Sequence, residues 1–116
     1  MAQRSFKEFN DGVKWALDST IYEVLGQEVL KAVYDHLRDR YAITGDEIPY
    51  RLDAVFDTLE GTFGFKGART ISRAAARRFY FKMGLRFIEN PEYRLQDYIE
   101  LAKKQLRLMP IEISQH

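Results

Sequence analysis

The sequence contains no cysteine, which excludes disulfide bonds, thiolate metal sites and thiol catalysis. No apolar run approaches the roughly 20 residues that a membrane-spanning helix needs, and the polar N-terminus is unlike a secretory signal. The formal net charge is +1, which argues against nucleic-acid binding by overall electrostatics. We therefore expect a cytoplasmic protein without a membrane partner, in which any anion binding comes from a local cluster of cations.

Motifs typical of enzymes are also absent, including the nucleophile elbow, the phosphate-binding loop, the dinucleotide fingerprint and zinc signatures. Glu28 and His36 lie on similar bearings of one predicted helix, but their spacing of eight residues is not the Glu-x-x-His of carboxylate-bridged bundles. We interpret His36 as structural. Asp46 and Glu47 lack the alternating oxygen ligands of a calcium loop, and we interpret them as favouring the N-terminus of the following helix. We expect no metal, no cofactor and no catalytic residue, although an enzyme is not excluded.

What the sequence does contain is apolar and aromatic residues, at 46% and 14%, enough to form a packed core. The apolar residues recur mostly at helical spacing, with glycine, proline and capping residues between the periodic segments. We therefore expect an all-α fold in one domain, residues 1–116, as a helical bundle of four main helices plus a short N-terminal helix. Residues 1–18 form its N-terminal segment and residues 109–116 its C-terminal tail.

Capping residues predict where the first helices begin. Ser5 opens a capping box and a short helix, which Gly12 weakens and which ends near Trp15 or Leu17. Thr20 opens a second capping box and the clearest helix of the sequence, which extends to about Arg40. Residues 41–49 contain glycine, aspartate and proline, so we expect a connecting loop there.

Glycine and proline also divide the second part of the chain. A helix over residues 52–63 ends at a tight corner that Gly64 and Gly67 bracket. A basic helix follows over residues 66–84, and its final glycine is expected to be a left-handed C-terminal cap. Proline in the first helical position predicts a last helix over residues 90–108.

The basic helix has an apolar side and a charged side. On a helical wheel, Ala68, Ala75 and Phe79 lie on the apolar side. The opposite side carries four cations, which we call the basic ridge: Lys66, Arg69, Arg73 and Arg77. Tyr80 and Phe81 fall on or beside the basic ridge. The pattern fits a central helix that is partly buried on both faces, a surface for polyanions, or a protein interface.

The preceding helix is acidic through Asp53, Asp57 and Glu60. These carboxylates would repel a nucleic-acid backbone that lay against them, and they offer the basic ridge partners within the protein. Internal pairing of this kind is the main argument against nucleic-acid binding at the level of sequence.

Residues 46–85, together with the helix before them, resemble a small uncharacterised all-helical domain family seen mainly in archaeal sequences. The resemblance is carried by the D-E-I-P turn at residues 46–49, the acidic helix, the glycine corner and the basic helix. It implies a helical domain that occurs alone or attached to signalling proteins, and it implies no activity and no functional residues.

From these patterns we expect a non-enzymatic helical module that binds a protein partner or a second copy of itself, forming a homo-oligomer. The predicted binding residues combine charge with aromatic area: Lys66, Arg69, Arg73, Arg77, Tyr80 and Phe81. One alternative is that the same ridge binds nucleic acid or another polyanion. Another is a small-ligand or pigment sensor with an aromatic pocket between helices, lined by residues such as Trp15, Phe56, Phe63, Phe79 and Tyr98.

Overall fold

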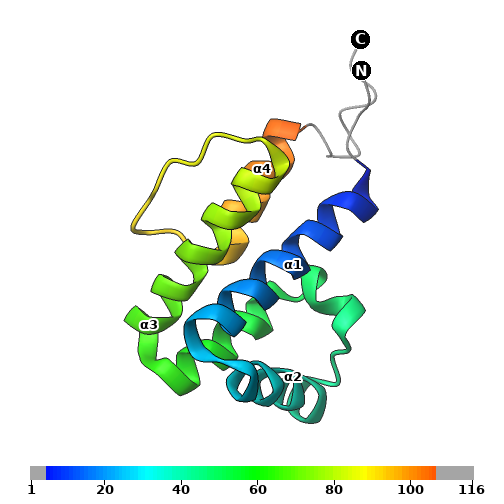
Figure 1. Ribbon diagram of the computed structural model, residues 1–116, viewed down its shortest axis with the longest axis vertical. Helices are drawn as coiled ribbons and strands as arrows, with labels where there is room; N and C mark the ends of the chain where they lie inside the picture. The colour runs from blue at the N-terminus through cyan, green and yellow to red at the C-terminus, as the bar shows by residue number, and fades with distance from the viewer. Residues whose placement is uncertain (1–4, 107–116) are drawn as a thin grey trace.

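The described part of the chain, residues 5–106 of a computed structural model, consists of helices and their connections, without a strand. In chain order the elements are α1 (Phe6–Leu25), α2 (Gln27–Tyr41), the 3-10 helix η1 (Gly45–Tyr50), α3 (Leu52–Met83) and α4 (Leu95–Leu106). α1 contacts α2, η1 and α3, while α4 packs against α3 (Figure 1). This architecture confirms the all-α prediction. None of the helices within residues 5–106 combines the length and the hydropathy of a membrane-spanning segment.

α1 is longer than predicted. It begins as expected, because the Ser5 hydroxyl accepts the backbone N–H of Glu8 at 3.0 Å. It then continues past Leu17 to residue 25, and Thr20, the predicted start of the next helix, is fully buried inside it. Gly12 does not end the helix because it lets α1 approach α3 closely: a Cβ at this position would lie 3.2 Å from the ring of Phe79. The packing that this contact permits outweighs the cost of about 1 kcal/mol that glycine carries in a helix.

The predicted helix over residues 20–40 is instead divided between α1 and α2 at Gly26. Its φ of +99° is accessible to glycine and strained for other residues. α2 then folds back on α1, where Tyr34 donates a hydrogen bond to the Asp18 carboxylate at 2.5 Å and Lys14 forms an ion pair with the same group at 2.9 Å. Burial and this hydrogen bond raise the pKa of Tyr34 to about 12. The break is therefore fixed by tertiary contacts between the two helices.

The predicted loop over residues 41–49 contains η1. Glu47 closes a capping box with Thr44, accepting its backbone N–H at 2.8 Å. Glu47 therefore stabilises η1, not the longer helix to which we assigned it. His36 is exposed, and its ring lies 6.0 Å from that of Tyr41. Among the described residues, no three His, Asp or Glu side chains are grouped so as to hold a metal.

α3 consists of two helical halves that meet at Gly64. This residue has φ +79° and ψ 170°, outside the helical region, while the residues around it continue the helix. The halves consequently run in different directions (Figure 1). The predicted corner is thus confirmed at Gly64, whereas Gly67 lies inside the second half. Gly84 ends α3 in the left-handed conformation, as expected.

The segment after α3 returns along the helix before α4 begins, so that α4 runs in the same direction as the second half of α3 (Figure 1). α4 begins at Leu95, later than predicted, because the Asn90 side chain accepts the N–H of Glu92 and forms a turn there. Tyr98 exchanges two hydrogen bonds with the Asn90 backbone, both 3.0 Å long, and thereby fixes the returning segment to α4. The predicted helix end near residue 108 and the tail lie outside the described residues.

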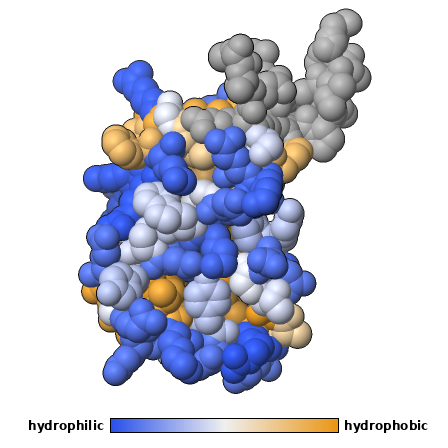
Figure 2. Space-filling view, turned by 45° about the vertical axis from the view of Figure 1, so that its right-hand side comes forward, coloured by the Kyte–Doolittle hydropathy of each residue, from blue (hydrophilic) through white to orange (hydrophobic). Residues whose placement is uncertain are grey.

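The helices share one hydrophobic core, in which Phe9, Phe79, Tyr80 and Tyr98 are among the largest fully buried side chains. Figure 2 shows a face on which hydrophilic residues cover most of the area and hydrophobic residues gather in separate patches. The aromatic residues of the predicted ligand pocket do not meet in one cavity. Trp15 and Phe63 line different cavities, and Phe56, Phe79 and Tyr98 are buried in the core.

Candidate nucleic-acid interface

The second half of α3 concentrates positive charge. Residues 65–83 include six cations and no acidic residue. Four of the six form the basic ridge, at the spacing of three or four residues that places side chains on one side of a helix. The other two, Arg78 and Lys82, lie on the side of α3 that faces α1, where Arg78 forms an ion pair with Glu23 at 2.6 Å.

Glu89, from the segment between α3 and α4, lies beside the basic ridge. Its carboxylate oxygens are each 3.5 Å from a guanidinium nitrogen, one of Arg73 and one of Arg77. One carboxylate is therefore shared by two arginines. Within residues 5–106, Lys66 and Arg69 have no carboxylate at ion-pair distance.

Aromatic rings hold several of these cations in place. The guanidinium carbon of Arg69 lies 4.9 Å from the ring centre of Phe65, and that of Arg77 lies 5.3 Å from the ring centre of Phe87. A cation over an aromatic face is attracted by the ring quadrupole. Such stacking restricts the side chains while leaving their N–H groups available to an anion.

Phe81 lies in line with the basic ridge, four residues beyond Arg77, and is 85% exposed. Tyr80, the neighbouring residue, is 1% exposed, so its predicted place on the binding surface is wrong. Its hydroxyl donates to the backbone carbonyl of Tyr98 at 2.6 Å, and its ring contacts Phe87. Burial raises the pKa of Tyr80 to about 12. No pattern in the sequence indicates that the returning segment and α4 cover this side of α3.

The acidic half of α3 does not neutralise the basic ridge. Asp53 forms an ion pair with Arg51 at 3.3 Å, and the hydrogen bond from Arg51 lowers the pKa of Asp53. Asp57 and Glu60 form no ion pair with an arginine in the part of the chain that the structure describes. Within residues 5–106 no ion pair joins the acidic half to the basic ridge, so the internal pairing that the sequence left open is not formed.

Sequence reasoning placed five of the six predicted binding residues on a common side of α3 but missed their neighbours. Phe87 and Glu89 lie in a segment without helical periodicity, which gave no information on where their side chains point. Trp15 comes from α1, and the Nζ atom of Lys82 lies 4.8 Å from the centre of its ring. In the sequence, the one sign that Trp15 is half-exposed is that it lies off the main apolar stripe of its helix.

No family model matches the chain, and no solved structure matches it. Two curated relatives are the small ribosomal subunit proteins uS4 of Frankia casuarinae and Frankia alni, which are 30% and 29% identical to this chain over 96 residues. Each match covers 81% of this chain and 46% of the relative. The chain thus spans about half the length of the curated relatives it matches, and it is similar to part of a small ribosomal subunit protein.

Proposed function

We propose that this protein binds RNA through the basic ridge. The observation that carries the proposal is the excess of positive charge on the second half of α3. Its six cations face two carboxylates at ion-pair distance within residues 5–106, those of Glu23 and Glu89. Contacts from arginine and lysine to phosphates dominate the affinity of proteins for nucleic acids.

The similarity to uS4 supports RNA as the nucleic acid. The name of these relatives places them in the small ribosomal subunit, which is an assembly of RNA and protein. The overall charge of +1 gives no general attraction to polyanions. Binding therefore has to come from the basic ridge, where the local charge is positive.

Charge reversal on the basic ridge tests the proposal. In the variant Lys66→Glu/Arg69→Glu, two cations without carboxylate partners become acids, and we expect RNA affinity to fall by at least about tenfold at moderate salt. The measurement is the fluorescence anisotropy of a labelled RNA, titrated at several salt concentrations. For four phosphate contacts, the logarithm of the binding constant of the unmodified protein should fall with log salt with a slope of about −3.

The matched control is Lys7→Glu/Lys31→Glu, which changes the net charge by the same amount on α1 and α2. These lysines are 85% and 74% exposed and pair with aspartates of their own helices. We expect this control to bind RNA nearly as well as the unmodified protein. An equal loss in both variants, or binding without salt dependence, would contradict the proposal.

Binding of a protein partner or of a second copy stays a prediction. Association between copies can be distinguished from RNA binding, because it raises the mass of the particle when no RNA is present. Native mass spectrometry at near-physiological ionic strength would detect a multiple of 13.7 kDa.

A further inference from the structure

We infer that the RNA is single-stranded, with bases that stack on Phe81 and on Trp15 at the C-terminal end of α3. This inference rests on the proposed function and names the class of RNA. It follows from three features of this end of the molecule: an exposed ring in line with the basic ridge, an exposed ring beside a lysine, and an apolar cavity next to that second ring.

Phe81 is the most exposed of the large hydrophobic side chains in the described part of the chain. It lies one helical turn beyond Arg77, so an RNA whose phosphates follow the basic ridge reaches this ring next. Its ring makes no contact with another aromatic ring within residues 5–106. The fold therefore leaves both faces of the ring available for stacking.

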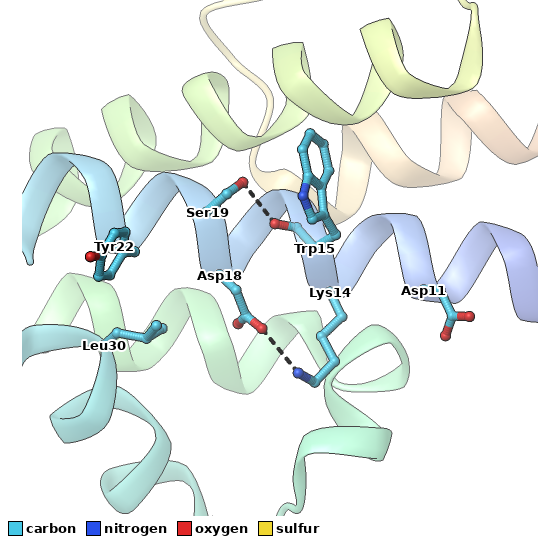
Figure 3. A pocket seen from close by; sticks show the side chains of 7 residues that line it. All are labelled: Asp11, Lys14, Trp15, Asp18, Ser19, Tyr22 and Leu30. Atoms are coloured by element: carbon cyan, nitrogen blue, oxygen red, sulfur yellow. Dashed lines mark hydrogen bonds and ion pairs between the residues drawn. The ribbon is translucent and has the colours of Figure 1, made fainter. Parts of the chain in front are cut away.

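Trp15 adds a second exposed ring, on α1, beside the C-terminal end of α3. It projects from α1 toward the second half of α3 (Figure 3), and it is 43% exposed. The Nζ atom of Lys82 lies 4.8 Å from the centre of its ring. Lys82 has no carboxylate at ion-pair distance among the described residues, so its charge remains available to a phosphate beside the ring.

A cavity of about 470 Å³ adjoins Trp15 on the outer side of α1, with Tyr22 and Leu30 at its other end (Figure 3). The size falls within the range of small-molecule sites. Asp18 also lines it, but this carboxylate already binds Lys14 and Tyr34. Lys14 lines the cavity too, but its charge is paired with Asp18. The cavity thus offers mainly apolar contact to a base, whereas the unpaired charge of Lys82 lies at the neighbouring ring.

Exposed rings beside cations suit unpaired bases. Proteins that bind single strands combine a basic track for the backbone with aromatic side chains on which bases stack. In a duplex the base faces are covered by the neighbouring pairs, and the deep major groove of double-stranded RNA is too narrow for side chains to read. A double-stranded RNA would therefore use the basic ridge but neither aromatic ring.

Trp15 provides a direct test, because it is the one tryptophan of the sequence. The full chain is titrated with oligouridine of about 12 nucleotides, within the site sizes of known single-strand binders, and separately with a duplex of the same length. We expect oligouridine to quench the fluorescence of Trp15 and to bind at least about tenfold more tightly than the duplex. The duplex should leave the fluorescence unchanged.

The variant Phe81→Ala tests the stacking itself. Its side chain is 85% exposed, so the substitution should leave the unfolding midpoint unchanged. We expect a loss of about tenfold in affinity for oligouridine and no change for the duplex. Tyr50→Ala on η1 removes another exposed ring, 71% exposed, and serves as the matched control that should bind oligouridine normally.

The possible outcomes separate this inference from the proposed function. Equal, salt-dependent binding of duplex and oligouridine without quenching would overturn the inference and leave RNA binding intact. Preference for oligouridine with full affinity in Phe81→Ala would overturn the stacking role. Failure to bind either RNA would overturn both.

Discussion

The two halves of α3 are continuous in sequence but opposite in charge. Residues 52–63 carry three acids and no cation, whereas residues 65–83 carry six cations and no acid. In a straight helix, Glu60 and Lys66 would still be six residues apart, whereas side chains that meet on a helix are three or four residues apart. The non-helical conformation of Gly64 lies between them, and the two halves run in different directions (Figure 1). Within residues 5–106 no ion pair joins the two halves, so the basic ridge keeps its excess charge.

Among the changes that test this comparison, replacing Gly64 should have the largest effect on stability. At φ +79° and ψ 170° a side chain is strongly disfavoured, so Gly64→Ala should reduce the free energy of unfolding by about 1–3 kcal/mol. Urea unfolding followed by circular dichroism measures the change.

Gly61→Ala is the matched control within the same helix. A Cβ there meets no atom within 4 Å, and its φ is not positive. This variant should be more stable than the unmodified protein by about 0.4–1 kcal/mol. Equal stability of the two variants would show that the kink does not depend on the glycine backbone.

An alkaline titration should show that the second half of α3 contributes a buried tyrosine, Tyr80, to the stability of the core. The pKa of Tyr80 and that of Tyr34 are both raised to about 12, compared with 10 in the unfolded chain. Between these values the folded state holds protons that the unfolded state has lost, so stability is complete below pH 10 and falls as the pH rises toward 12.

Tyr80→Phe should lower stability by about 1 kcal/mol at neutral pH, because it removes the buried hydrogen bond from the Tyr80 hydroxyl to the backbone carbonyl of Tyr98. Above pH 10 its stability should fall less steeply than that of the unmodified protein. Urea midpoints measured from pH 7 to 12 give both quantities. RNA affinity should not change, and a loss of binding in this variant would return Tyr80 to the binding surface.

The smallest expected effect comes from Glu89. Because its carboxylate is shared by Arg73 and Arg77, Glu89→Gln removes a competitor for phosphate. We expect RNA affinity to rise about two- to fivefold. The slope of the logarithm of the binding constant against log salt should steepen by the amount that corresponds to about one further phosphate contact. Glu92→Gln, an exposed change of equal charge in the same segment, is the control. An equal rise in both variants would indicate a general charge effect in place of competition at the basic ridge.

The features predicted correctly are those that depend on neighbours in the chain. The N-cap at Ser5, the corner at Gly64 and the end of α3 at Gly84 each follow from a residue that favours one local conformation. The errors occur where packing outweighs such preferences. α1 continues through Gly12 because that glycine admits a close contact with α3, and the capping pattern at Thr20 is overridden by burial.

The candidate site shows the same division. Helical spacing placed Lys66, Arg69, Arg73, Arg77 and Phe81 on one side of the helix, and the structure keeps them there. The carboxylate that faces two of these arginines could not be predicted, because Glu89 lies in a segment whose path is set by contacts with α3 and α4. The sequence also left open whether the acidic half pairs with the basic ridge, since that depends on the direction of the chain after Gly64, and the structure shows no such ion pair within residues 5–106.

The sequence by itself determined that residues 66–84 form a helix and which residues carry its charge, because both depend on spacing along the chain. The tertiary structure decided which of two adjacent aromatic residues is buried. Tyr80 is 1% exposed and Phe81 is 85% exposed. Each residue turns a helix by roughly 100°, so the two rings point in different directions, and the segment after α3 together with α4 covers only the side on which Tyr80 lies.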